Sequence, residues 1–236
     1  MTGWVRVILT FDGVPDRVAL HASDSTARGL GEDARVTQPR RVVFLPGASG
    51  DREFWRGAGE ALPAAWEKVY LSWPGLGDEP QNAAVRGFDD LVERVADELE
   101  RPSDLVAQSI GGIIAVRVAA RAPSLVRRLV LVATSGGVDM RRLGADDWRE
   151  DYQRAFPHAA RWVADPQPDQ TGQLRRIDSP TLLLWGDSDP VSPVAVGEHL
   201  ADLIPGAALH VIAGGTHDLA RDQPVAVARL IAAHLG

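Results

Sequence analysis

The chain of 236 residues contains no cysteine. This absence excludes disulfide bonds, thiolate metal sites and a cysteine nucleophile. No apolar stretch approaches the roughly 18 residues that a membrane-spanning helix needs. The first residues, Met1 to Arg6, also lack a basic region followed by an apolar core, so no signal peptide is predicted. We therefore expect a cytoplasmic protein with no membrane partner.

Long runs of like charge are also missing, and the formal net charge is −7. An acidic chain lacks the basic face that nucleic acid or an anionic membrane requires. Residues 47–50 lack the Lys-Ser/Thr ending of a phosphate-binding loop, and no G-x-G-x-x-G follows a predicted strand. The histidines lack a metal-ligand spacing such as H-E-x-x-H. We expect a small-molecule substrate, no nucleic acid partner, no cofactor and no metal; the sequence indicates no oligomeric state.

Short apolar runs alternate with helical patterns along most of the chain. The predicted strands comprise residues 3–11, 17–22, 41–45, 68–72, 104–108, 128–133, 181–185 and 208–212. The predicted helices comprise residues 53–62, 88–99, 110–120, 194–203 and 225–234. This alternation predicts a single α/β domain over residues 1–236, with a mainly parallel sheet and helices on both faces.

Residues 135–179, called the insert below, interrupt this alternation. They contain several aromatic residues and a proline-rich exit at Pro166 and Pro168. We predict one or two amphipathic helices that lie outside the main sheet and form a short lid.

The stretch from Leu105 to Gly112 has the spacing of a nucleophile elbow, with Ser109 at its centre. An apolar strand leads into the serine, and a helical pattern follows it. Ala107 and Gly111 stand two residues before and after Ser109, where a larger side chain would collide with the neighbouring turn. The elbow therefore predicts that Ser109 is a catalytic nucleophile. A lone serine is otherwise most often a turn or helix-cap residue.

A serine hydroxyl is a weak nucleophile that needs a base, and the base needs an orienting carboxylate. Both are expected where later strands end, because open α/β sheets place ligands at the carboxyl ends of their strands. Asp187 and Asp189 follow the strand predicted at 181–185, and His217 follows the strand predicted at 208–212. The order serine, acid, histidine is the one associated with this elbow.

These motifs resemble the α/β-hydrolase family over nearly the whole chain. The resemblance implies an eight-stranded, mostly parallel sheet with helices on both faces and a small helical lid. The family's acid commonly lies in G-x-x-D-x-x-x-P; Gly186, Asp189 and Pro193 match this pattern, and Asp187 does not. The resemblance thus assigns the acid to Asp189 and the base to His217.

Two loops carry further resemblance. The family's H-G-x-x-G loop corresponds to residues 46–50, where Pro46 replaces the histidine but both glycines remain. The resemblance implies that the backbone N–H groups of Ala48 and Ile110 form an oxyanion hole. Residues 73–77 are similar to the family's D-x-P-G-x-G turn.

Alternatives to the acid and the base remain open. Asp189 is also placed to cap the helix that starts near Pro193, and Asp187 or Asp139 are other candidate acids. The remaining histidines fall within predicted strands, helices or the insert: His21, His158, His199, His210 and His234.

Aromatic residues suggest an apolar substrate pocket. The candidate substrate-binding residues are Trp73, Trp148, Tyr152, Phe156 and Trp162. Each of them, like Trp55, has a plain alternative as a core or lid-packing residue.

The predicted function is hydrolysis of a small carboxylic ester, thioester or lactone through an acyl-enzyme on Ser109. One alternative on the same triad is a carbon–carbon bond hydrolase. Another is a lyase, because residues 44–55 are similar to the menaquinone-pathway synthase. Such a lyase needs basic residues for an acidic substrate, and the candidates are Arg52, Arg141, Arg142, Arg149 and Arg161. An alternative of another class is a non-catalytic small-molecule binding protein.

Overall fold

The computed structural model describes residues 7–9 and 38–236. Parallel strands form one sheet in the order β1-β7-β6-β5-β4-β2-β3. The strands are β1 (Val7–Leu9), β2 (Arg41–Leu45), β3 (Glu67–Tyr70), β4 (Ser103–Gln108), β5 (Val126–Val132), β6 (Thr181–Gly186) and β7 (Ala208–Ile212). The predicted parallel α/β sheet is confirmed.

The described sheet has seven strands rather than the predicted eight. The strand predicted at residues 17–22 lies outside the described residues. Of the strand predicted at residues 3–11, the structure describes Val7–Leu9, which pairs with β7.

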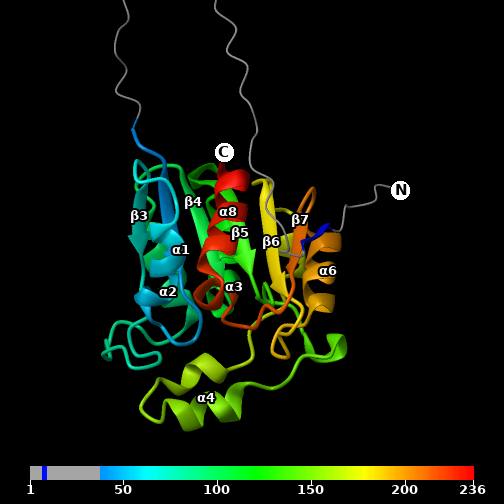
Figure 1. The fold of residues 1–236 in the computed structure, drawn as a ribbon. Helices are drawn as coiled ribbons and strands as arrows, with labels where there is room; N and C mark the ends of the chain where they lie inside the picture. The colour runs from blue at the N-terminus through cyan, green and yellow to red at the C-terminus, as the bar shows by residue number, and fades with distance from the viewer. Residues whose placement is uncertain (1–6, 10–37) are drawn as a thin grey trace, which may run out of the picture.

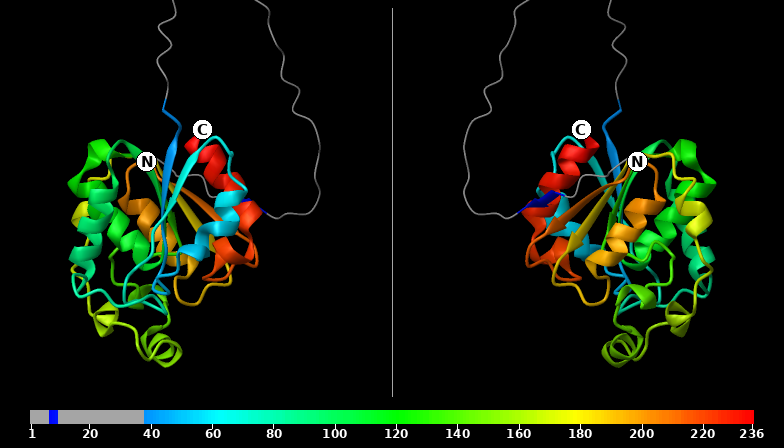
Figure 2. Two further views of the ribbon diagram at one scale, coloured as in Figure 1. Left: turned by 90° about the vertical axis from the view of Figure 1, so that its left-hand side faces the viewer. Right: turned by 90° about the vertical axis from the view of Figure 1, so that its right-hand side faces the viewer.

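Helices cover both faces of the sheet, as predicted (Figures 1 and 2). The helices are α1 (Arg56–Glu60), α2 (Phe88–Glu98), α3 (Ile110–Arg121), α4 (Arg149–Ala155), α5 (Thr171–Leu174), α6 (Val194–Leu203), α7 (Leu219–Asp222) and α8 (Pro224–Leu235). The helix predicted over residues 53–62 is divided into a 3₁₀ turn, Arg52–Trp55, and α1. Further 3₁₀ turns comprise Pro123–Leu125, Arg141–Leu143 and Arg161–Ala164.

Side-chain alternation along the strands produces two apolar layers. In β4, Leu105 and Ala107 pack with α2, α3 and α6, whereas Val106 packs on the opposite face with α1, α7 and α8. Successive strand side chains point to opposite faces, so a strand that lies between two covered faces is buried on both sides. This packing explains why β2, β4 and β6 are buried throughout.

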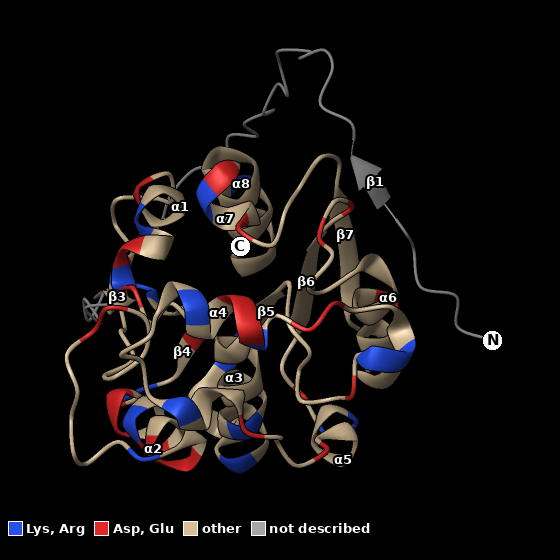
Figure 3. Cartoon of the chain, turned by 90° about the horizontal axis from the view of Figure 1, so that it is seen from below, with Lys and Arg blue, Asp and Glu red and all other residues tan. Residues whose placement is uncertain are grey.

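The insert lies between β5 and β6 and contains α4 and α5. Figure 1 shows α4 below the lower edge of the sheet, and Figure 3 shows it in front of that edge. Hydrogen bonds join the insert to strand-end loops, from Asp146 N to Pro190 O (2.9 Å) and from Ala160 N to Gly75 O (2.7 Å). The predicted position outside the sheet is thus observed, while opening and closing as a lid stays a prediction.

In the described part of the chain, no helix has both the length and the apolar character that crossing a bilayer requires.

Two partly buried histidines predict a loss of stability in mild acid. Burial lowers the pKa of His210 and of His234 below 6.5. The unfolded chain therefore binds more protons than the folded chain as the pH falls through 6.5, and protonation favours unfolding. We expect the temperature at the midpoint of thermal unfolding to decrease when the pH is lowered from about 7.5 to about 5.5.

Substitution of His234 checks this linkage. His234→Gln should reduce the acid-induced fall, whereas His158→Gln, which changes an exposed side chain, should leave it intact. Calorimetry or circular dichroism melts at the two pH values measure the difference. An unfolding midpoint that does not change over this range would contradict the prediction.

Candidate active site

The strand-to-helix turn between β4 and α3 holds Ser109 in a strained conformation. Its φ is 53° and its ψ is −123°. Among described residues other than glycine, only Ser109 and Ala133 have a positive φ. A non-glycine residue in this region costs on the order of 1–3 kcal/mol and persists only where its surroundings hold it. The Ser109 carbonyl accepts hydrogen bonds from Thr134 Oγ1 (2.6 Å) and Gly112 N (2.9 Å).

Steric contacts explain the small residues around Ser109. A Cβ on Gly111 would lie 2.5 Å from Pro46 O, and one on Gly112 would lie 2.4 Å from Thr134 Oγ1. Ala107 is fully buried in β4. The turn is thus too crowded at positions 111 and 112 for any side chain.

The structure brings the three candidate triad residues together. His217 Nε2 lies 3.2 Å from Ser109 Oγ, and His217 Nδ1 lies 2.9 Å from Asp189 Oδ2. Asp189 is 4% exposed, whereas the His217 side chain is 25% exposed. An ionised carboxylate accepts hydrogen bonds only, so Nδ1 carries the proton and Nε2 is free to accept one from the serine.

Backbone amides hold the Asp189 carboxylate. Its Oδ1 accepts hydrogen bonds from Val191 N (2.9 Å) and Ser192 N (3.0 Å). Helix α6 begins at Val194 without a side-chain cap. Asp189 therefore does not serve as the cap of α6, and its second oxygen is directed to the imidazole.

Close backbone packing sets the loops after β6 and β7 side by side. A Cβ on Gly186 would lie 2.1 Å from Gly215 O, and Ser188 N donates to the same carbonyl at 2.9 Å. Asp187 is exposed and accepts a hydrogen bond from Gly214 N at 2.7 Å. Asp187 thus ties these loops together and does not contact the imidazole.

The other candidate acid and bases lie elsewhere. Asp139 is exposed and pairs with Arg141, whose guanidinium lowers the pKa of Asp139 to about 2. The other described histidines lie in different elements: His210 in β7, His199 in α6, His234 in α8 and His158 in an exposed part of the insert. His21 lies outside the described residues.

Ala48 lies in the loop after β2. The three consecutive backbone carbonyls that precede Ala48 each accept a hydrogen bond. Trp55 Nε1 donates to Leu45 O (2.9 Å) and Trp73 Nε1 donates to Pro46 O (2.8 Å). Gly50 N donates to Gly47 O at 3.1 Å. The C=O and N–H of a trans peptide point in opposite directions. The Ala48 N–H therefore points away from Gly50.

The Ala48 loop packs against the serine turn. A Cβ on Gly47 would lie 3.1 Å from Ser109 Cβ. Ile110 is the first residue of α3, so its N–H lacks an intrahelical acceptor. Within residues 7–9 and 38–236, the Ala48 N–H also has no acceptor. Two unsatisfied backbone donors thus flank Ser109, as an oxyanion hole requires.

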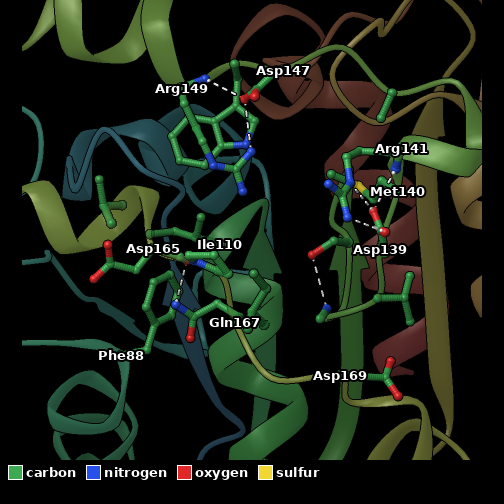
Figure 4. Close-up of a pocket in the computed structure, with 18 of the residues that line it drawn as sticks. Phe88, Ile110, Asp139, Met140, Arg141, Asp147, Arg149, Asp165, Gln167 and Asp169 are labelled. Carbon is green, nitrogen blue, oxygen red and sulfur yellow. Dashed lines mark hydrogen bonds and ion pairs between the residues drawn. The ribbon is translucent and has the colours of Figure 1, made fainter.

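A cavity of about 570 Å³ adjoins the site through Ile110, and the insert forms much of its wall. Its apolar lining includes Phe88, Ile113, Val163 and Trp148. Figure 4 shows Asp139 paired with Arg141, and Asp147 paired with Arg149, on this lining. Of the predicted substrate-binding residues, Trp148 is the one that lines this cavity.

The other predicted aromatic residues have different positions. Trp73 is fully buried, and Trp162 packs edge-on against Phe88 at 5.7 Å between ring centres. Tyr152 and Phe156 line a separate hollow of about 170 Å³ within the insert. Trp73 and Trp162 are outside the lining of this cavity, because the Trp73 ring supports a loop and the Trp162 ring packs on Phe88. A role of the predicted aromatic residues in substrate binding stays a prediction.

Sequence reasoning missed Gln108 and the apolar wall from α2 and α3. Gln108 Nε2 donates to His217 O at 3.2 Å, and a Cβ on Gly47 would lie 2.1 Å from Gln108 Oε1. Gln108 thus lies between the loops that carry Ala48 and His217. A polar residue at the end of an otherwise apolar strand, next to the serine, was the available signal.

No cluster of three or more His, Cys, Asp or Glu suited to a metal ion occurs in the described part of the chain.

Comparisons with known proteins find similarity to alpha/beta hydrolases. A model of the alpha/beta hydrolase family matches residues 42–163, and a model of the alpha/beta hydrolase fold matches residues 157–222. The chain is 27% identical over 230 residues to a pimeloyl-[acyl-carrier protein] methyl ester esterase of Neisseria meningitidis serogroup B, covering 75% of this chain and 86% of that protein.

A second relative has a different activity in its name. The 2-succinyl-6-hydroxy-2,4-cyclohexadiene-1-carboxylate synthase of Enterobacter sp. (strain 638) is 27% identical over 239 residues, covering 81% of this chain and 90% of that protein. Among solved structures, a thermophilic esterase from Thermogutta terrifontis superposes with a TM-score of 0.71 and 22% identity, over 84% of this chain and 90% of that one. This last likeness supports the fold alone.

Proposed function

Since the chain belongs to the alpha/beta hydrolase family and is an enzyme of that type, we propose that it hydrolyses a small carboxylic ester with Ser109, His217 and Asp189. The observation that carries this proposal is the hydrogen-bonded series from Ser109 Oγ through the imidazole to Asp189 Oδ2. That arrangement is able to remove the serine proton and to stabilise the imidazolium that results.

The proposed reaction has two steps. Ser109 Oγ attacks the ester carbonyl while His217 Nε2 takes the hydroxyl proton and then delivers it to the departing alkoxide. Water, activated by the same imidazole, then hydrolyses the acyl-enzyme and releases the acid. Asp189 holds the imidazole with Nδ1 protonated, and the Ala48 and Ile110 N–H groups stabilise the oxyanion in both steps.

The cavity supplies the proposed substrate site, and the insert is proposed to act as its lid. Ile110 lies at the junction of the cavity and the serine turn, so one part of a bound ester would extend from Ser109 beneath the insert. A volume of about 570 Å³ suits a small organic molecule. A methyl ester, as in the name of the Neisseria relative, is one member of this class.

The synthase-like alternative receives less support from the charges. It needs basic residues for an acidic substrate, yet the cavity lining holds five aspartates, Asp139, Asp146, Asp147, Asp165 and Asp169, against two arginines. Arg141 and Arg149 are both already paired with aspartates. Of the remaining candidates, Arg52 and Arg142 line neither cavity, and Arg161 lines the small hollow.

A covalent probe tests the proposal. An alkyl fluorophosphonate should add one phosphonyl group to the intact protein, and peptide mapping should locate it on Ser109. The same preparation should hydrolyse p-nitrophenyl esters of short acids. An adduct elsewhere, or no adduct and no turnover, would favour the binding-protein alternative. Faster cleavage of a vinylogous diketone than of every ester would replace the proposal with carbon–carbon hydrolysis.

A further inference from the structure

Tyr152, on α4 of the insert, makes two hydrogen bonds outside the insert. Its hydroxyl donates to Ala48 O at 2.8 Å and accepts from Gly77 N at 2.9 Å. The side chain is buried, and burial raises the pKa of the Tyr152 hydroxyl above 10.0. The hydroxyl therefore remains protonated and able to donate throughout the pH range in which such enzymes are assayed.

Ala48 belongs to the loop that packs against the serine turn, and Gly77 belongs to the turn at residues 73–77. Ala48 O belongs to the peptide after the one that carries the Ala48 N–H, and Pro46 O, two residues earlier in the chain, accepts a hydrogen bond from Trp73 Nε1. Gly77 has a φ of 53°, and a Cβ there would lie 1.9 Å from Ser49 O. The turn at residues 73–77 therefore packs directly on the Ala48 loop, and the Tyr152 hydroxyl bridges the two.

Resting on the proposed function, we propose that Tyr152 is a positioning residue that holds the Ala48 N–H in place for the oxyanion and so couples docking of the insert to an ordered oxyanion hole. Trp55 and Trp73 anchor the carbonyls before Ala48 from the main domain. Tyr152 anchors the carbonyl after it from the insert. When the insert moves away, Ala48 loses the support on that side.

The chain offers a matched pair of variants, because its two tyrosines are Tyr70 and Tyr152. Tyr152→Phe removes the bridging hydroxyl and keeps the ring. Tyr70 lies on β3, and its ring stacks on Phe44. Tyr70→Phe removes a hydroxyl that has no hydrogen-bond partner among the described residues. Melting curves of both proteins establish that they are folded.

Kinetics with a p-nitrophenyl ester separate positioning from substrate contact. Tyr152→Phe should lower kcat about 10- to 100-fold, because a displaced oxyanion donor loses much of its contribution in the transition state. KM should change by less than about 3-fold, and the pH profile should keep its shape, because the loss does not involve ground-state binding or proton transfer. Tyr70→Phe should match the wild type. A kcat equal to that of the wild type, a rise in KM alone, or a lost limb of the pH profile would overturn the proposal.

Inhibition by a transition-state analogue provides a second test of the oxyanion hole. An aryl trifluoromethyl ketone forms a tetrahedral adduct whose oxyanion requires the same donors as the substrate. Its inhibition constant should rise in Tyr152→Phe by the same factor by which kcat/KM falls. Unchanged inhibition beside a reduced kcat would show that Tyr152 does not act through the oxyanion hole.

Hydrogen exchange makes this test independent of turnover. Amides in residues 46–50 and 73–77 should exchange faster in Tyr152→Phe than in the wild type or in Tyr70→Phe. Equal exchange would refute the support role even if the wild type hydrolysed no ester. Conversely, absence of a Ser109 adduct in the wild type would refute the proposed function and leave the exchange result to decide the role of Tyr152.

Discussion

Ser109→Ala is expected to lower kcat for ester hydrolysis by about 10⁴- to 10⁶-fold, since the acyl-enzyme cannot form without the hydroxyl. Alanine keeps the Cβ and removes one oxygen, so the crowded turn formed with Gly111 and Gly112 remains intact. Steady-state hydrolysis of a p-nitrophenyl ester measures the loss, and a melting curve establishes that the variant is folded. The fluorophosphonate adduct should disappear with the activity.

Ser124→Ala is the matched control for this variant. Ser124 lies in the exposed 3₁₀ turn Pro123–Leu125, which joins α3 to β5. Its removal should change neither turnover nor labelling. Turnover of Ser109→Ala at the wild-type rate would eliminate the nucleophile assignment and, with it, the proposed mechanism.

Asp189→Asn should reduce kcat by about 10⁴-fold while the variant remains folded. The reason lies in the geometry of the two oxygens. Oδ1 accepts from Val191 N and Ser192 N, while Oδ2 faces His217 Nδ1. An asparagine that keeps its oxygen toward the two amides presents its NH₂ group to the imidazole. The ring must then accept at Nδ1 and carry its proton on Nε2, which cannot take the Ser109 proton.

Asp187→Asn offers a control two residues away, on the same loop. Asparagine retains an oxygen for Gly214 N, so the loop should keep its conformation and kcat should stay within about 3-fold of the wild type. Nuclear magnetic resonance of the His217 ring nitrogens provides the tautomer directly. An Nδ1-protonated ring in Asp189→Asn, or a larger loss in Asp187→Asn, would contradict the assignment of the acid.

Whether a feature of this protein was predictable from the sequence depends on how far apart in the chain the interacting residues are. Ser109 was predictable because the elbow is a local steric pattern. The structure shows at Gly111 the crowding that the pattern anticipated, and it adds a tight contact at Gly112. Asp189 and His217 were predictable because parallel strands bring their carboxyl ends to one edge. The helix bounds were also close, as in α6, which was predicted at the residues where it is found.

The insert was the least predictable part of the chain. Its aromatic residues indicated a pocket, yet Trp148 lines the cavity while Tyr152 donates to a loop carbonyl and Trp162 packs on Phe88. The residue type alone does not distinguish these positions, because an aromatic side chain suits a core, a pocket or a hydrogen-bonded position. Which of these each ring adopts depends on how the insert folds back on the strand-end loops.

The sequence by itself determined the parallel sheet, the strained turn at Ser109 and the placing of an acid and a histidine at neighbouring strand ends. These features follow from hydrophobic periodicity and from steric limits within a few residues. Only the tertiary structure decided that Asp187 joins two loops through Gly214 N, that Trp73 supports a loop, and that Tyr152 reaches Ala48 from the insert. Those choices depend on contacts between residues about 30 to 100 positions apart, whose directions are set when the chain packs.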